Sequence, residues 1–376
     1  MSEPSIDDPK LLASYRTALA EFGGNKEVTG VDIGYLYESG RRTEKPGIRV
    51  HFGDISPRKW LKSAEFLPEM IDGVRVMPVR ATYRLHDSAA PDSLPTIPLQ
   101  PPIRRTTRFD PIQPGVSVSH HMLRGGTLGL IVYDQLSGEA CILSNWHVLA
   151  GHPGARPGDP IVQPGAGSGG SDPGHTIATL HRSIFDQDGD AAIAKLNGKR
   201  GINPAQVDTD VVITTARIPR LGEIVVKSGV RTGVTAGLVD GCGRYFLRMP
   251  AGNEVVVGMD GFRIVPLDDR NADDREVSGS GDSGSVWYSA DDQAGVGLHV
   301  AGEASADPTQ ELGIACYLPP VLARLEVGLV PPGSSPRLLA TSPDAEEGDS
   351  QALLAESVAR LTRVVERLLS ERGRDA

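Results

Sequence analysis

The chain has 376 residues, of which 39% are hydrophobic and 23% are charged, and its formal net charge is −10. An acidic chain does not suit the phosphate backbone of nucleic acid or an anionic membrane surface, so we expect neither as a partner. No apolar run approaches the roughly 20 residues of a membrane helix, and the first residues lack the pattern of a signal peptide. We therefore expect a soluble, cytoplasmic protein, and its 44 glycines and 29 prolines favour a turn-rich β fold.

The first part of the chain, residues 1–85, predicts a small α+β domain. Nothing in it indicates chemistry. We expect a helix over 9–22, strands over 28–36, 48–52 and 74–83, and a short helix over 57–67.

The rest of the chain divides by composition. Residues 86–114 are proline-dense, which predicts an extended linker. Short β-like runs separated by turn residues fill 115–328 and predict a sandwich or barrel. A second linker is expected over 329–350. Residues 351–371 predict a helix with a heptad seam, either a coiled coil that assembles the protein or binds a partner helix, or a helix that docks on its own barrel.

Three motifs in the β-rich region carry the residues of nucleophilic catalysis. His147 follows Cys-Ile-Leu-Ser-Asn-Trp, Asp190 precedes the apolar run 191–196, and Ser283 lies in Gly-Asp-Ser-Gly. A serine hydroxyl needs a base to become a nucleophile, and an imidazole can take its proton and later deliver it to the leaving group. A carboxylate orients that imidazole, and Asp188 competes with Asp190 for this role.

In this region the sequence resembles the trypsin/chymotrypsin-like serine peptidases, in the order His, Asp, Ser. Leu-Ser-Asn-Trp-His-Val-Leu is similar to bacterial stand-alone trypsin-like proteins and to plant narrow-leaf proteins. The resemblance implies a mainly β fold with a double six-stranded β-barrel of chymotrypsin type. It implies His147, Asp190 and Ser283 as the catalytic residues, and the N–H groups of Gly281 and Ser283 as the oxyanion hole. We expect Asp282 to anchor this loop, with no partner apparent in the sequence.

The expected substrate pocket contains Val277, Ser278, His299 and Gly302. Trypsins carry an aspartate where this chain has Val277, which argues against cleavage after Lys or Arg. Gly-Leu-His299 resembles the Gly-Ile-His run of glutamyl endopeptidases, which implies cleavage after Glu or Asp. The alternative is that His299 packs in the wall of a pocket with small-apolar preference.

We therefore expect a serine endopeptidase that hydrolyses protein or peptide substrates through an acyl-enzyme, without metal or cofactor. The family suggests a regulatory or defence role. The bulky Trp146 beside the histidine leaves open a protease-fold scaffold that binds a partner and hydrolyses poorly. A further hypothesis is that residues 1–85 and the linker cover the cleft as a built-in inhibitor.

Overall fold

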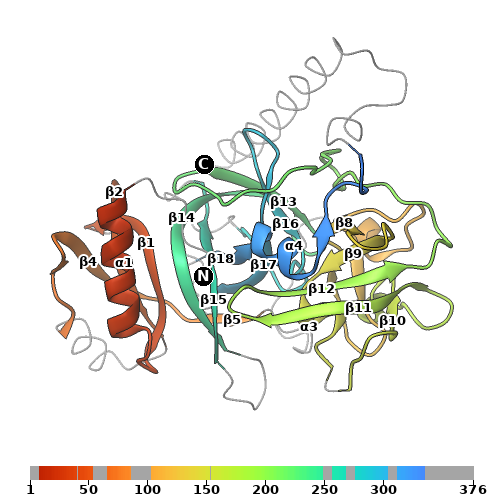
Figure 1. Ribbon diagram of the computed structural model, residues 1–376, viewed down its shortest axis with the longest axis horizontal. Coiled ribbons are helices and arrows are strands. Elements are labelled where there is room, and N and C mark those ends of the chain that lie inside the picture. Colours follow the sequence, from red (N-terminus) through yellow and green to blue (C-terminus); the bar gives the residue numbers. More distant parts are fainter. Residues whose placement is uncertain are drawn as a thin grey trace, which may run out of the picture.

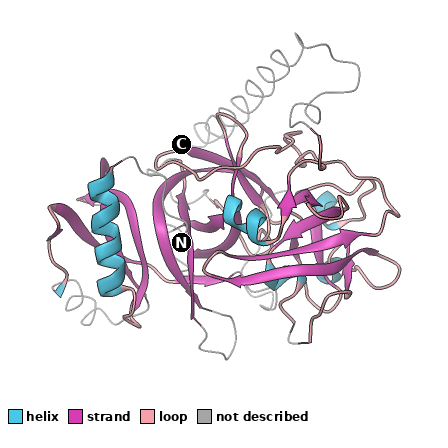
Figure 2. Cartoon of the chain, viewed as in Figure 1, coloured by secondary structure: helices cyan, strands magenta, loops and turns pink. Residues whose placement is uncertain are grey.

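The computed structural model describes residues 8–39, 41–53, 66–85, 103–152, 154–248, 256–267, 276–303 and 311–334. Its strands form two curled sheets with few helices (Figure 2), so the predicted fold class, mainly β with a double β-barrel of chymotrypsin type, is confirmed. The predicted helix over 351–371 and nearly all of that over 57–67 lie outside the described residues. In the described part of the chain, no helix combines the length and apolar character that a membrane span requires.

The first sheet has eight strands in the order β19-β8-β9-β12-β11-β10-β6-β7. Its interior is an apolar cluster that includes Val118, Ile131 and Ile142. Antiparallel pairing of β9 with β12 sets Ser144 opposite Ala192, near the strand ends that lead to His147 and Asp190. The elements are β6 (Ser117–His120), β7 (Gly126–Thr127), β8 (Leu130–Asp134), β9 (Ala140–Ser144), α3 (Trp146–Leu149), β10 (Pro160–Val162), η2 (Ala166–Ser168), β11 (Thr176–Asp186), β12 (Gly189–Leu196) and β19 (Val327–Gly328).

The second sheet has eleven strands, six of which close into a ring. The ring order is β13-β16-β17-β18-β15-β14, and β14 pairs again with β13. Short turn segments at the strand ends place Ser283 just before β16. The elements are β13 (Ile224–Gly229), β14 (Gly233–Arg248), β15 (Val256–Val265), β16 (Val286–Ser289), β17 (Gly295–Glu303), β18 (Gly313–Tyr317) and α4 (Leu318–Arg324).

The N-terminal strands belong to the same second sheet (Figure 1). β1 pairs antiparallel with β14, from Gly30 opposite Tyr245 to Gly34 opposite Gly241. The predicted helix over 9–22 is confirmed as α1, which packs on β1 and β2, while the domain boundaries themselves stay a prediction. The elements are α1 (Pro9–Phe22), β1 (Val28–Glu38), β2 (Arg41–Phe52), β3 (Met70–Ile71), β4 (Val74–Arg80) and β5 (Tyr83–Leu85).

A fully buried ion network holds the N-terminal strands to β14 and β15. Arg49 donates to both carboxylate oxygens of Asp32 at 2.7 and 2.6 Å and to Asp240 at 2.6 Å. Asp240 also accepts from Arg263 at 3.0 Å, and Asp32 lies 3.1 Å from His51. Burial alone would raise the pKa of Asp32, but the Arg49 guanidinium holds it well below its usual range. The contact between Arg49 and Asp240 is therefore the ion pair that joins the two parts and would be lost if they separated.

The end of the predicted linker 86–114 is packed rather than extended. Residues Ile103–Thr106 form a 3-10 turn, η1, and Arg105 is only 1% exposed. Its guanidinium donates to Ser228 at 2.7 Å and to Asp208 at 2.8 Å. Proline density predicts a local extended backbone, but it carries no information about an arginine that anchors the segment to the second sheet.

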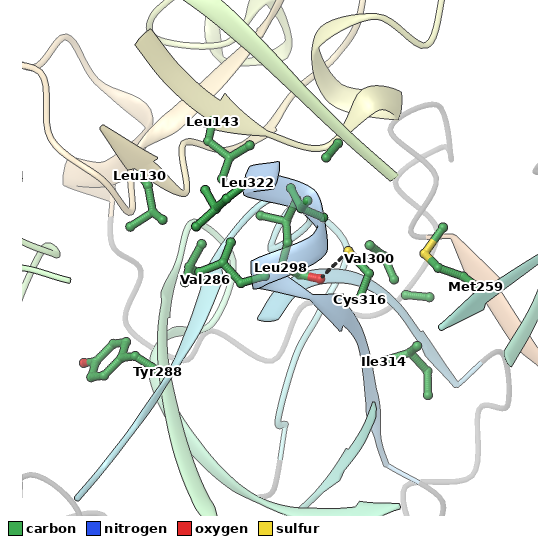
Figure 3. Packing of buried hydrophobic residues seen from close by; sticks show 14 of the residues in the cluster. Leu130, Leu143, Met259, Val286, Tyr288, Leu298, Val300, Ile314, Cys316 and Leu322 are labelled. Carbon is green, nitrogen blue, oxygen red and sulfur yellow. Dashed lines mark hydrogen bonds between the residues drawn. The ribbon is translucent and has the colours of Figure 1, made fainter. Parts of the chain in front are cut away.

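The two sheets share one apolar core, which fixes the seam between them (Figure 3). Leu130 and Leu143 come from the first sheet, Val286 and Leu298 come from the second, and Leu322 of α4 packs with them. Full burial of such a side chain contributes about 1.5–3 kcal/mol. Residues at the seam are thus held by rigid strands on both sides.

Candidate active site

His147 is placed at the seam by a short helix that follows β9. α3 begins at Trp146, directly after Asn145, whose side-chain amide donates to the Asp190 carbonyl at 2.7 Å. Because β9 and β12 are hydrogen-bonded neighbours, this contact ties the start of α3 to the start of β12. The local fold therefore brings together an imidazole and a carboxylate that are far apart in sequence.

Asp190 holds the imidazole of His147 through two contacts. One carboxylate oxygen is hydrogen-bonded to Nδ1, and the other accepts from the His147 backbone N–H at 3.1 Å. Asp190 is fully buried and His147 is 8% exposed. A neutral imidazole that donates from Nδ1 to a carboxylate keeps Nε2 as an acceptor. Nε2 is buried and has no hydrogen-bond partner among the described residues.

Asp188, the competing candidate, is used elsewhere. Its carboxylate pairs with Arg324 of α4 and does not contact His147. The structure thus selects Asp190 as the partner of the histidine.

Trp146, beside His147 in the sequence, packs on β11. Its ring stacks on Phe185 of β11 with 4.5 Å between ring centroids, and Phe185 lies opposite Asp190 in the sheet. The ring therefore braces the sheet beneath the His147–Asp190 pair.

Ser283 lies in a loop whose glycines adopt a backbone that other residues avoid. Gly281 has φ of +111° and Gly284 has φ of +89°. A Cβ added at Gly284 would lie 2.4 Å from the Thr127 carbonyl oxygen, so the loop rests directly on β7. Thr127 also binds the loop from that side, because its N–H donates to the Ser283 carbonyl at 2.7 Å and its hydroxyl to the Gly281 carbonyl at 2.8 Å.

One group of this loop that matters for chemistry has no protein partner among the described residues. It is the buried hydroxyl of Ser283. Buried polar groups in folded proteins are nearly always paired, and exceptions often mark a functional site. An oxyanion hole formed by the N–H groups of Gly281 and Ser283 stays a prediction.

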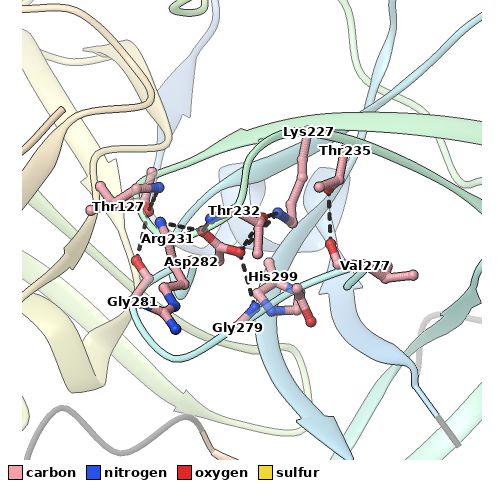
Figure 4. Close-up of polar contacts among 12 residues, drawn as sticks. Thr127, Lys227, Arg231, Thr232, Thr235, Val277, Gly279, Gly281, Asp282 and His299 are labelled. Carbon is pink, nitrogen blue, oxygen red and sulfur yellow. Dashed lines mark hydrogen bonds and ion pairs between the residues drawn. The ribbon is translucent and has the colours of Figure 1, made fainter. Parts of the chain in front are cut away.

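Asp282 anchors this loop from inside the second barrel (Figure 4). It accepts from the ammonium of Lys227 at 3.0 Å, the hydroxyl of Thr232 at 2.6 Å, and the N–H groups of Arg231 and Gly279 at 2.8 and 3.0 Å. Burial would raise the pKa of Asp282, but Lys227 and these donors hold it below its usual range. The sequence predicted the anchor but not its partner, although a lysine inside the apolar β13 run was the available signal.

The Ser283 loop and α3 meet at Gly126. A Cβ at Gly126 would lie 2.5 Å from a methyl group of Val148 and 2.8 Å from the Ser283 carbonyl oxygen. The residue after His147 and the residue expected to be the nucleophile thus flank the same glycine. A contact between the Ser283 hydroxyl and the His147 ring stays a prediction.

The predicted pocket residues converge on β17 and β18. A Cβ at Gly313 would lie 3.2 Å from Cε1 of His299 and 3.5 Å from the Ser278 hydroxyl. His299 is fully buried, and its Nδ1 accepts from the Trp287 indole N–H at 3.3 Å. Val277 is buried, and its carbonyl accepts from the Thr235 hydroxyl (Figure 4).

Glu311 also lies at this place and was not predicted from the sequence. Its carboxylate accepts from the N–H groups of Val277 and Ser278 at 3.0 and 3.2 Å. Burial raises the pKa of Glu311 to about 7, against the lowering effect of those two N–H donors. A lone glutamate after a stretch of small residues gave no pattern from which this position could be inferred.

The three cysteines, Cys141, Cys242 and Cys316, are free and buried. Burial raises the pKa of Cys141 to about 11, so the thiol is unreactive at neutral pH. In the described ranges, no group of three or more His, Cys, Asp or Glu side chains could hold a metal ion.

No family model matches this chain, and no curated protein sequence matches it. Among solved structures it is similar to a Nocardiopsis protease (NAPase), at 16% identity over 58% of this chain and 97% of that one, with a TM-score of 0.42. It is similar to Thermobifida fusca Protease A at 16% identity over 58% of this chain and 98% of that one, TM-score 0.42. It is also similar to a protein described as a glutamic acid specific serine protease that utilizes a histidine triad in substrate binding, at 18% identity over 58% of this chain and all of that one, TM-score 0.42. These neighbours are trypsin/chymotrypsin-like serine proteases.

Proposed function

We propose that this protein is a serine endopeptidase in which Ser283 is the nucleophile, His147 the general base and acid, and Asp190 the group that orients the imidazole. The observation that carries the proposal is the His147–Asp190 pair, in which Nδ1 is bound to a buried carboxylate while Nε2 is left without a partner among the described residues. The buried Ser283 hydroxyl supports it, because it has no partner within the described part of the chain and its loop and α3 both contact Gly126.

In the proposed reaction, Ser283 Oγ attacks the carbonyl carbon of the scissile peptide bond while its proton passes to His147 Nε2. Asp190 stabilises the imidazolium, and the N–H groups of Gly281 and Ser283 stabilise the oxyanion, each by about 3 kcal/mol. The imidazolium then protonates the leaving amine as the C–N bond breaks. Water attacks the resulting ester by the same route and regenerates the Ser283 hydroxyl.

Cleavage after Glu or Asp remains the proposed preference. His299 and Ser278, which flank Gly313, offer the imidazole and hydroxyl that such a side chain would need. Glu311 works against a charged acidic side chain unless it is protonated, and its pKa of about 7 makes it neutral in mildly acidic solution. Profiling a peptide library at pH 6 and pH 8 tests this, with acidic preference expected to be stronger at pH 6. Cutting only after small apolar residues at both values would contradict it.

The decisive experiment is covalent labelling with a fluorophosphonate probe, followed by mass spectrometry of the modified peptide. We expect one adduct on Ser283, lost in Ser283→Ala and retained in Ser280→Ala, because Ser280 is an exposed serine of the same loop. Absence of labelling in the wild-type protein would favour the alternative, a protease-fold scaffold that hydrolyses poorly. The cytoplasmic location and the regulatory or defence role stay predictions.

A further inference from the structure

One edge of β17 is shared by three segments that follow each other along the strand. β18 occupies the opposite edge over its whole length. On the first edge, β16 pairs up to Leu298, and His299 then exchanges bonds with the Ser283 loop: its N–H donates to the Ser285 carbonyl at 2.9 Å, and its carbonyl accepts from Gly284 at 3.0 Å. The next positions, Ala301–Glu303, pair with β5. On this edge, the part of β17 that directly follows the contact with the nucleophile loop is therefore already paired with β5 of the same chain.

The register and direction of β5 follow from this pairing. Leu85 lies opposite Ala301, Arg84 opposite Gly302 and Tyr83 opposite Glu303, in antiparallel order. The β5 backbone therefore runs along β17 toward the level of His299, where the Ser283 loop is bonded. An extended polypeptide added to this edge in the same direction would deliver its next carbonyl groups to Ser283.

We propose that β5 occupies the strand edge on which a polypeptide substrate must pair, so that the protein is closed to extended substrates by its own chain until β5 leaves. This inference rests on the proposed function, because it assigns the edge to the substrate of Ser283. Short substrates that need only the nucleophile and the oxyanion hole do not require the edge.

The N-terminal strands clamp β5 in place. Tyr83 is fully buried and Leu85 is 3% exposed, both within the main core. The Tyr83 hydroxyl is 2.5 Å from Nδ1 of His51 on β2, and its ring meets that of Tyr245 on β14 edge to face, with 5.3 Å between centroids. His51 in turn belongs to the buried ion network. Release of β5 therefore requires loosening of the N-terminal strands.

The hypothesis stated from the sequence was that residues 1–85 and the linker cover the active-site cleft. The present proposal assigns the inhibition to β5 alone. β1, β2 and β4 extend the second sheet beyond β14, and α1 packs on β1 and β2, whereas α3 contacts β12, β6 and β11 of the first sheet (Figure 1). The body of the N-terminal unit therefore does not lie over His147. Only β5, at its end, reaches the strand next to Ser283.

Arg84 gives a sharp test because its side chain is exposed while its backbone lies between two strands. β5 pairs with β17 on one side and with Arg248 of β14 on the other, so proline at 84 removes a ladder hydrogen bond. We expect Arg84→Pro to raise cleavage of fluorescein-labelled unfolded casein about tenfold or more, with hydrolysis of a small p-nitrophenyl ester unchanged within about twofold. Arg84→Ala, which keeps the N–H, is the matched control and should behave as wild type. Equal rates of casein cleavage in all three proteins would overturn the proposal.

A milder variant covers the case in which Arg84→Pro does not fold, as judged by near-ultraviolet circular dichroism. Tyr83→Phe removes only the hydroxyl bonded to His51 and keeps the buried ring. It should raise casein cleavage severalfold with the ester rate unchanged. No change in casein cleavage would contradict the proposal that the Tyr83–His51 contact holds β5 in place.

Binding measurements separate this proposal from the proposed function. In a Ser283→Ala background, where no chemistry occurs, Arg84→Pro should bind labelled unfolded casein more tightly than Arg84→Ala by fluorescence anisotropy. Hydrogen exchange of the bound protein should rise at 83–85 and stay slow at 301–303. Casein binding that leaves exchange at 83–85 unchanged overturns the inference, whether or not Ser283 reacts with the fluorophosphonate.

Discussion

The ammonium group of Lys227 lies 3.0 Å from the carboxylate of Asp282, and both side chains are fully buried. This pair fixes the residue next to Ser283 from within the second barrel. Burial lowers the pKa of Lys227, and Asp282 opposes that effect. The position of the nucleophile loop thus depends on an internal lysine on β13 rather than on a chain terminus.

We expect Lys227→Met to be strongly destabilising, because it leaves the Asp282 carboxylate buried without its cation. Loss of one partner of a buried pair costs about 3–5 kcal/mol. Urea denaturation measures this, and Lys199→Met, at an exposed lysine, should change the free energy of unfolding by less than about 0.5 kcal/mol. Equal stabilities of the two variants would show that the pair does not hold the loop.

Asp190→Asn should lower kcat by about 10⁴, because an amide no longer fixes the proton on Nδ1 of His147. Asp188→Asn is the matched control, since Asp188 pairs with Arg324 instead. Steady-state hydrolysis of a small ester compares them. A larger loss in Asp188→Asn would reverse the assignment.

Gly281→Ala should reduce kcat through the backbone rather than through a clash. The nearest atom to an added Cβ is 3.6 Å away, but φ is +111°, so a side chain strains the loop and turns the N–H that is expected to bind the oxyanion. Loss of one such donor costs about 10²–10³ in kcat. Gly174→Ala, where an added Cβ has open space, should leave kcat unaltered.

The raised pKa of Glu311 predicts a specific dependence of stability on pH. The native carboxyl holds its proton up to about pH 7, while the unfolded chain releases it near 4.5. The contribution of Glu311 is therefore full below about pH 4.5 and is lost as pH rises through 7, by on the order of 3 kcal/mol.

Chemical denaturation between pH 4 and pH 8 measures this dependence. The difference in unfolding free energy between wild type and Glu311→Gln should shrink or reverse across that interval. Glu326→Gln, at a side chain that is 71% exposed, should give a constant difference. A constant difference for Glu311→Gln as well would refute the assignment.

The candidate site residues could be named from the sequence because each lies in a short local sequence motif. His147 ends an apolar run, Asp190 begins one, and Gly281 to Gly284 form a turn whose positive φ values need glycine. Short strands and turn residues predicted only a sandwich or barrel, and the chymotrypsin-type double barrel was implied by the resemblance of the motifs to a family. The pairing of His147 with Asp190, chosen over Asp188, follows from the register of β9 with β12, and local patterns only suggested it.

Contacts between distant segments could not be predicted in the same way. Side chains that bind groups remote in sequence include those of Lys227, Glu311 and Arg105. Hydrophobic periodicity indicates local secondary structure and gives no information about such partners. The pairing of β5 with β17 could not be predicted either, because a strand of three residues is too short to show an alternation of apolar and polar residues.

The continuity of β1 with β14 has a consequence for any shortened form of this protein. A chain that started at residue 115 would expose the backbone hydrogen-bonding groups of β14 that pair with residues 30–34. It would also expose Asp240 and Arg263 to water without Arg49. A long uncovered strand edge is a template for association with another molecule. Such a fragment would be prone to self-association, so gain of activity on truncation would have to be separated from aggregation.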